Sequence, residues 1–113
     1  MRIHHLAFRT PDVSSLVHFY RELLGLIEVA TQPHSVWLRS GDAVVMIEAI
    51  EPGETTVAHT NELVAFAVDH HTQKRLRDTL AAAGFAREAH TEATDYYRDP
   101  DGRRVGLSTY PLP

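Results

Sequence analysis

The chain has 113 residues, 43% of them hydrophobic and 23% charged, which is typical of one small globular domain and excludes a disordered or fibrous chain. A net charge of -4 with scattered basic residues excludes a nucleic-acid-binding surface. The absence of cysteine excludes disulfides, thiolate zinc sites and cysteine nucleophiles. Because the sequence lacks both a secretion signal and an apolar run of about 18 residues, we expect a cytoplasmic protein with no membrane partner.

The first half of the chain is expected to form a strand, a helix and three further strands. Residues 2–9 alternate weakly and end at Thr10-Pro11-Asp12, which is a chain break and a helix N-cap. Apolar residues at helical spacing predict a helix over residues 12–24, and Gly25 ends it. Short strands are predicted over residues 26–30, 35–39 and 43–50.

The second half repeats this order after a polar linker at residues 51–61. A strand is predicted over residues 63–68 and a helix over residues 69–83, which Gly84 ends. A tight turn at residues 99–102 separates the last two strands. The three closing strands are predicted over residues 85–88, 95–98 and 103–109.

The two halves share residues as well as element order. At a near-constant offset of about 58 positions, residues 5–8 lie over 63–66, residues 24–26 over 83–85, and Ile47 over Val105. An internal repeat of this kind predicts an α+β fold built from two tandem βαβββ units. We expect these units within a single domain over residues 1–113, at about residues 1–50 and 62–110.

Five segments carry the clearest family pattern: a His-to-Asp opening, a Phe-Tyr helix ending in Leu-Gly, two strands and an Asp-Pro-Asp-Gly turn. They lie at residues 5–12, 19–26, 45–48, 63–69 and 97–102. Together they resemble the vicinal oxygen chelate superfamily, which includes glyoxalase I, extradiol dioxygenases, fosfomycin-resistance proteins and bleomycin-binding proteins. The resemblance implies that the units curve into an open β-barrel cleft and that two chains form a homodimer. It also implies a divalent metal, which would polarise substrate oxygens as a Lewis acid.

The resemblance places the four metal-ligand positions of the family at His5, Glu48, Leu63 and Gly106. The first two side chains suit Zn, Ni, Mn or Fe, whereas leucine and glycine cannot ligate. Two protein ligands are fewer than the three that catalytic sites usually keep. A further ligand could come from His4, His34, His59 or His90. The sequence therefore leaves two alternatives open. In the first the protein binds one divalent metal. In the second it binds none, and His5 and Glu48 form a buried hydrogen-bonded pair.

Four further side chains are predicted to line the ligand cleft. Arg9 shares a strand face with His5, and Trp37 shares one with Arg39. An aromatic wall beside a guanidinium suits a planar or anionic ligand, although Trp37 as core and Arg39 as a strand-edge charge is an equal alternative. Tyr96 and Tyr97 must face opposite sides of their strand, and Tyr97 is taken as the one in the cleft.

Three functions remain open at this point. The first is a small-molecule-binding protein without metal, similar to the bleomycin-resistance branch, and the missing ligand pair favours it. The second is a metal-dependent lyase, isomerase or dioxygenase that uses His5, Glu48 and one further ligand. The third is an enzyme in which His5 and Glu48 act as catalytic acid and base without metal. The sequence carries neither a nucleophile elbow nor a glycine-rich phosphate loop.

Overall fold

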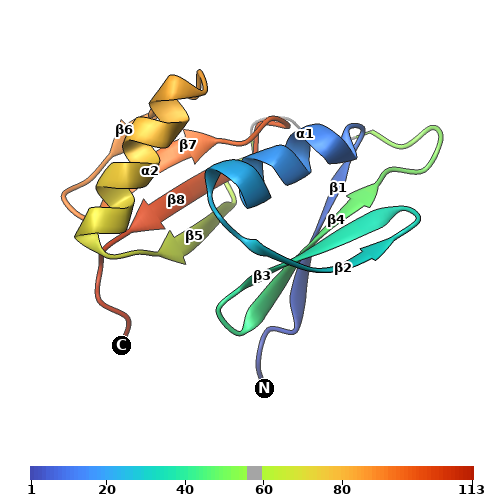
Figure 1. Cartoon of the computed structure of the whole chain (residues 1–113), viewed down its shortest axis with the longest axis horizontal. Helices are drawn as coiled ribbons and strands as arrows, with labels where there is room; N and C mark the ends of the chain where they lie inside the picture. Colours follow the sequence, from blue (N-terminus) through green and yellow to red (C-terminus); the bar gives the residue numbers. More distant parts are fainter. Residues whose placement is uncertain (56–59) are drawn as a thin grey trace. The chain divides into compact units, whose positions relative to one another are not determined.

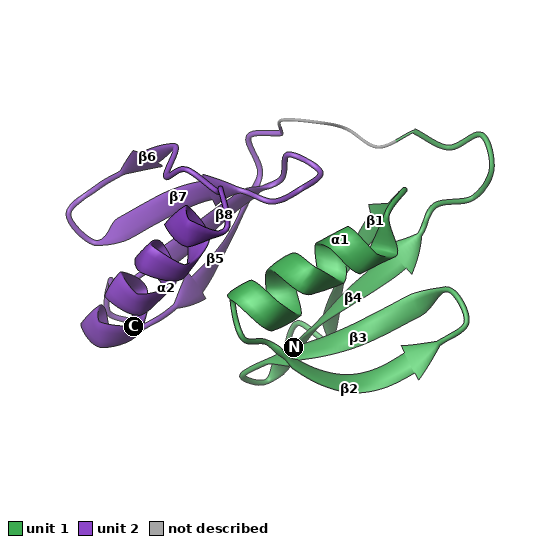
Figure 2. Cartoon of the chain, turned by 45° about the horizontal axis from the view of Figure 1, so that its top comes forward, with its two compact units in different colours: residues 1–56 green, residues 57–113 purple. Residues whose placement is uncertain are grey.

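The computed structural model describes residues 1–55 and 60–113. It divides into two compact units, residues 1–56 and 57–113, which are coloured separately in Figure 2. The division falls inside the polar linker that the sequence predicts at residues 51–61. Within the described part of the chain, none of the helices combines the length and the apolar character that a membrane crossing needs.

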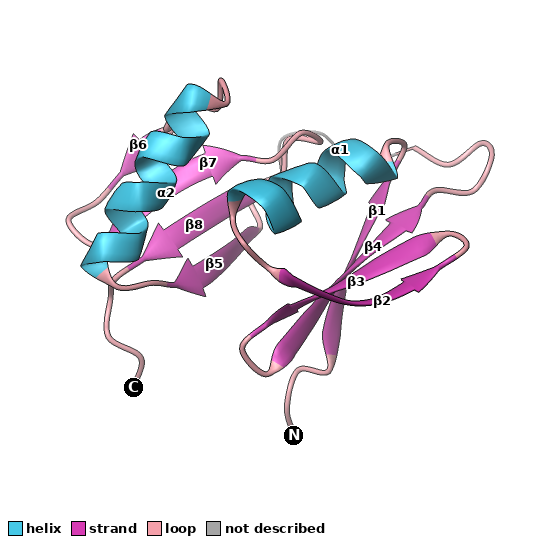
Figure 3. Ribbon diagram, viewed as in Figure 1, coloured by secondary structure: helices cyan, strands magenta, loops and turns pink. Residues whose placement is uncertain are grey.

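Unit 1 is a four-stranded sheet with a helix across one face (Figures 1 and 3). Its strands lie in the order β1-β4-β3-β2, with β1 parallel to β4 and the other neighbours antiparallel. The elements are β1 (His5–Thr10), α1 (Val13–Val17), the π-helical continuation η1 (His18–Leu23), β2 (Ile27–Gln32), β3 (Ser35–Ser40) and β4 (Ala43–Ala49).

Unit 2 repeats this topology, with strand order β5-β8-β7-β6 and one parallel pair, β5 with β8. The α+β class and the two βαβββ units expected from the sequence are therefore confirmed. The elements of unit 2 are β5 (Leu63–Ala67), α2 (His70–Ala82), β6 (Ala89–His90), β7 (Thr94–Arg98) and β8 (Arg104–Ser108).

The strand predicted at residues 85–88 is displaced. The Phe85 amide bonds back to the Leu80 carbonyl at 2.9 Å, so this residue still closes helix α2. Sheet pairing begins only where the Glu88 amide donates to Tyr96 at 2.8 Å, and the strand itself is Ala89–His90. The end of the helix therefore uses the residues that the apolar pattern assigned to the strand.

Both helices begin at an aspartate, as the sequence predicts for the first one. A carboxylate oxygen of Asp12 accepts the Ser15 amide at 3.1 Å, and Asp69 accepts the Thr72 amide at 2.7 Å. The first helix ends in π geometry, in which the Leu24 amide bonds to the Phe19 carbonyl at 3.0 Å. Hydrogen bonds of this longer span are not visible in the spacing of the apolar residues.

Each helix covers the sheet face that carries the buried side chains. In unit 1 the Phe8 and Tyr20 rings lie 5.5 Å apart, and register pairing puts Ile47 on the same face as Phe8. In unit 2 the Gln73 side chain donates from α2 to the Leu107 and Ala93 carbonyls, both at 2.9 Å. The opposite face of each sheet is called the helix-free face below.

Candidate functional site

Three rows of side chains cross the helix-free face of unit 1. They follow from the registers of β1 with β4 and of β4 with β3, because residues paired across a sheet point to the same side. The first row is His5, Val44 and Arg39; the middle row is Ala7, Met46 and Trp37; the third row is Arg9, Glu48 and Ser35. The expected faces of Arg9, Trp37 and Arg39 are therefore correct, whereas their contact with a ligand stays a prediction.

Trp37 is the aromatic centre of this face and is half-buried. Its indole Nε1 donates to Ser35 Oγ at 3.3 Å, which turns the ring toward the third row. The His5 ring lies nearly parallel to it, with 16° between the planes and 6.4 Å between the centroids. The middle row thus presents an apolar, aromatic strip between two polar rows.

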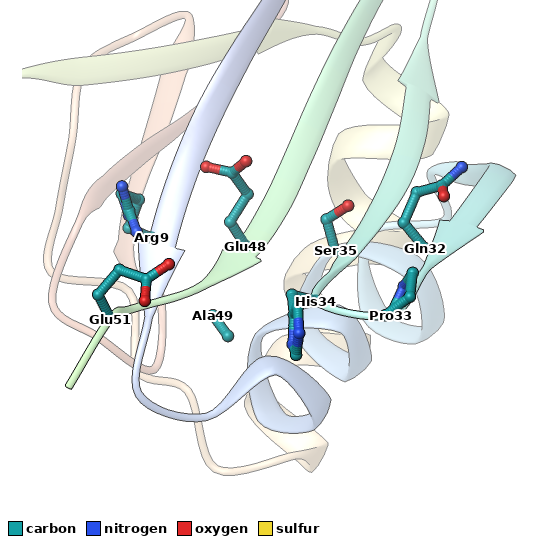
Figure 4. Close-up of a pocket in the computed structure, with 8 residues that line it drawn as sticks. All are labelled: Arg9, Gln32, Pro33, His34, Ser35, Glu48, Ala49 and Glu51. Carbon is teal, nitrogen blue, oxygen red and sulfur yellow. The ribbon is translucent and has the colours of Figure 1, made fainter.

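The third row opens into a pocket of about 360 Å³ beside the turn that joins β2 and β3. A volume of this size is within the range of small-molecule sites. Glu48, Ser35 and Gln32 rise from three strands on the same side of the sheet, whereas His34 and Ala49 point the other way (Figure 4). We call this the hairpin pocket, lined by Arg9, Gln32, Pro33, His34, Ser35, Glu48, Ala49 and Glu51.

In the hairpin pocket Arg9 has an ion-pair partner, whereas Glu48 has none among the described residues. Arg9 Nη2 lies 2.8 Å from Glu54 Oε1, an ion pair in which both side chains are partly exposed. Glu48 is half-buried, and within residues 1–55 and 60–113 its carboxylate makes no ion pair or hydrogen bond. Withdrawal from water without a partner costs a carboxylate free energy, so this group is an open acceptor site.

His5 and Glu48 do not form a metal site together. His5 pairs with Val44, which lies four residues before Glu48 on β4. At a rise of about 3.3 Å per residue and about 4.8 Å between strands, the Cα atoms of His5 and Glu48 lie about 14 Å apart. The hydrogen-bonded pair expected without metal is wrong for the same reason, because His5 is exposed and its Nδ1 instead lies 2.9 Å from Nδ1 of His4.

Three of the four further histidines lie within the described residues. His4 lies beside His5, His34 lines the hairpin pocket and His90 lies in β6. Among the residues that the structure describes, no three His, Asp or Glu side chains gather as metal ligands would. His59 lies outside the described residues. The donor set seen here therefore does not fit the divalent metal that the family resemblance implies.

Unit 2 corrects the matching of the two halves. Leu63 pairs with Arg104, and the next pairs on this face are Ala65 with Gly106 and Ala67 with Ser108. Leu63 remains the counterpart of His5, but Gly106 now corresponds to Met46, and Ser108 corresponds to Glu48. The correspondence shifts because the connection between β7 and β8 is longer than the connection between β3 and β4. A constant offset in the sequence does not take this difference into account, whereas the strand pairing does.

Gly106 also leaves no room for a side chain. A Cβ built there would lie 3.2 Å from the Ala65 Cβ and 3.3 Å from the Thr94 Cγ2. Its Leu63 neighbour contributes a third contact at 3.4 Å. The position of unit 2 that corresponds to Met46 is thus closely surrounded by packed neighbours.

The prediction that Tyr97 lines the cleft is wrong. Tyr97 pairs with Val105 on the helix-covered face and is 1% exposed. Burial raises the pKa of its phenol, and no described group hydrogen-bonds to its hydroxyl. Tyr96 faces the helix-free side instead, with the Arg104 guanidinium 4.1 Å from its ring centroid. The choice between the two tyrosines depends on the register of β7 with β8, which places Tyr97 opposite the apolar Val105.

Solved structures with the same fold cover nearly the whole chain. The fosfomycin resistance protein FosX from Mesorhizobium loti has 19% identity and a TM-score of 0.81, covering 98% of this chain and 93% of its own. The oxidase ChaP-H2 has 17% identity and a TM-score of 0.79, covering 99% and 95%. Lactoylglutathione lyase from Agrobacterium tumefaciens has 20% identity and a TM-score of 0.73, covering 95% and 92%. At these identities the likeness shows the fold alone.

The sequence also matches a family model over residues 2–107. The family is described as the Glyoxalase/Bleomycin resistance protein/Dioxygenase superfamily. The match spans both units and the linker between them.

Proposed function

The chain belongs to the Glyoxalase/Bleomycin resistance protein/Dioxygenase superfamily. From this premise we propose that it binds a small organic molecule, and that this binding does not use a metal ion ligated by His5 and Glu48. The observation that carries the proposal is the half-buried Trp37, which lies in an apolar row beside the hairpin pocket on the helix-free face of unit 1. Binding sites for small molecules commonly combine an apolar wall with a few convergent polar groups.

The alternative functions have less support from the residues. A metal-dependent lyase, isomerase or dioxygenase would need a ligand cluster that the described residues do not form. An acid-base pair would need two groups that reach the reacting part of one substrate together, whereas His5 and Glu48 stand in the first and third rows. The solved relatives include a resistance protein, an oxidase and a lyase, so the fold itself does not choose between these functions.

The binding proposal is tested by NMR with uncharged benzenoid probes such as phenethyl alcohol, in a buffer that contains EDTA. We expect amide shifts to concentrate at Ala7, Trp37 and Met46, the middle row of unit 1. Trp37→Leu should remove these shifts, whereas Tyr96→Leu, the matched aromatic change in unit 2, should leave them. Shifts confined to unit 2, or equal in the two variants, would overturn the proposed site.

The metal question needs a separate titration. The protein, purified without a histidine tag, is titrated with Zn, Ni, Mn and Fe(II) beside a His5→Ala/Glu48→Ala variant. We expect the wild type to bind each ion no more tightly than the variant does. Stoichiometric binding that the double substitution abolishes would instead support the metal-dependent alternative.

A further inference from the structure

The hairpin pocket has an excess of hydrogen-bond acceptors, and this excess indicates the chemistry of its ligand. Within residues 1–55 and 60–113, Glu48 takes part in none of the ion pairs, and the single guanidinium of the pocket is already paired with Glu54. Gln32 and Ser35 stand beside Glu48 and point to the same side of the sheet (Figure 4). A partner for this arrangement must bring donors and, for the carboxylate, a positive charge.

The indole of Trp37 continues the pocket along the same strand. Ser35 and Trp37 are two residues apart on β3, and Ser35 pairs with Glu48, so the Cα atoms of Trp37 and Glu48 lie diagonally across the two strands, about 8 Å apart. The bond from Nε1 to Ser35 Oγ holds the indole on the side of the pocket. Since Ser35 Oγ accepts this bond, its own proton remains available to a second acceptor.

Charge favours a cation over an anion at this end of the face. Arg9 pairs with Glu48 across the sheet and lines the same pocket, but its guanidinium forms an ion pair with Glu54. Arg39 is exposed and lies on the far side of the middle row from Glu48. Glu48 is less exposed and lines the pocket itself. Because charges interact more strongly where water is partly excluded, the carboxylate has the larger effect on a group inside the pocket.

Resting on the proposed function, we infer that the ligand is an arylalkylamine, a planar aromatic ring that carries an amine on a short alkyl linker. Its planar ring lies on Trp37, and its protonated nitrogen, joined by a linker of two or three bonds, donates to Glu48 and to the acceptors beside it. A linker of this length suits a ring and a carboxylate that rise on the same face from diagonal positions of β3 and β4, about 8 Å apart at their Cα atoms. The assignment also gives the half-buried Glu48 carboxylate an ion-pair partner, because the neighbouring Arg9 is paired with Glu54 and Glu48 takes part in none of the ion pairs among the described residues.

Three benzenoid probes that differ in one terminal group test this inference: phenethylamine, phenethyl alcohol and hydrocinnamate. Trp37 is the single tryptophan of the chain, so quenching of its fluorescence reports binding at the site directly. At neutral pH we expect the amine to bind roughly tenfold more tightly than the alcohol, and the carboxylate to bind most weakly.

Glu48→Gln should bring the affinity of the amine down to that of the alcohol and leave the alcohol unchanged. Asp42→Asn is the matched control, because it removes one negative charge in the exposed turn between β3 and β4, at the other end of these strands. Equal affinities for amine and alcohol, or tightest binding of hydrocinnamate, would overturn the amine and leave ligand binding intact. If none of the three quenches Trp37 at millimolar concentration, the amine and the proposed function both fail.

Discussion

The two units have the same topology but carry different residue types on their helix-free faces. On the helix-free face, unit 1 carries His5, Trp37 and Glu48 where unit 2 carries Leu63, Tyr96 and Ser108. The strand order and the parallel first pair are the same in both units. A duplicated backbone therefore fixes where side chains point, and the residue types at those points decide which copy can bind a ligand.

The helix-covered faces differ in a second way. Asp95 of unit 2 is buried and holds Arg77 at 2.9 Å and Arg87 at 3.0 Å. Register pairing makes Val36 its counterpart in unit 1, because both residues pair opposite the matched Ile47 and Leu107. Unit 2 thus fixes its helix with an ion cluster at a position where unit 1 uses a hydrocarbon side chain.

The largest expected effect comes from matched core truncations. Ile47 and Leu107 are 0% and 1% exposed, and either change to alanine should lower the free energy of unfolding by about 3 kcal/mol. Urea denaturation followed by Trp37 fluorescence reports on unit 1, and circular dichroism reports on both units. A loss confined to one of the two variants would show that the cores are not equivalent.

Removal of the buried anion should have a somewhat smaller effect. We expect Asp95→Ala to cost about 2 kcal/mol, because two charged hydrogen bonds are lost while the partly exposed arginines regain water. Asp78→Ala removes the exposed pair with Lys74 and should be nearly neutral. The same denaturation series measures both variants, and equal losses would contradict the role of the buried cluster.

The next prediction concerns the rings on the two helix-free faces. Trp37→Leu should weaken phenethyl alcohol binding by roughly tenfold, since a stacking surface is removed. Tyr96→Leu should leave the affinity unchanged, because the Tyr96 ring lies in unit 2 beneath Arg104. Isothermal titration calorimetry measures both, and a larger loss in the Tyr96 variant would move the site to unit 2.

Tyr97→Phe is expected to raise stability by up to about 1 kcal/mol, because it removes a buried hydroxyl that has no partner among the described residues. Because the pKa of this phenol is raised in the folded state, the folded protein favours the protonated form. The part of the stability that depends on this protonation is fully present below the pKa of an unfolded tyrosine and is lost as the pH rises through the folded pKa. Alkaline denaturation of the variant should therefore begin at higher pH. Loss of ligand affinity in this variant would restore Tyr97 to the site.

The smallest effect is expected at the helix caps. Hydrogen bonds from the Ser15 hydroxyl and amide lower the pKa of Asp12, and the Thr72 amide does the same for Asp69. Each ionised carboxylate therefore stabilises the folded protein above about pH 3.8, which is the ordinary pKa of an aspartate. This stabilisation is lost as the pH falls through the lower pKa of the folded state. Asp12→Asn and Asp69→Asn keep a capping oxygen and should flatten acid denaturation slightly. An unchanged acid profile in both variants would contradict this assignment.

The sequence predicted the elements well wherever the signal is local. The aspartate at residue 12, the glycines at residues 25 and 84 and the turn at residues 99–102 mark element ends in the chain itself, and the repeated order of elements indicated two units. The prediction of a strand over residues 85–88 was wrong because the hydrogen bonds that end α2 extend to Phe85, so the strand begins only at Ala89. The π-helical end of the first helix gave no periodic signal.

The sequence by itself determined the family, the two βαβββ units and the strand faces that Arg9 shares with His5 and Trp37 shares with Arg39. Only the tertiary structure showed that Glu48 lies four residues beyond the partner of His5, that Ser108 is its counterpart, and that Tyr96 replaces Tyr97 on the helix-free face. The physical reason is strand register. Pairing joins residues that lie far apart in the chain, and a shift by an even number of positions keeps a side chain on the same face. The four positions between Val44 and Glu48 therefore leave the carboxylate on the face of His5 but out of its reach.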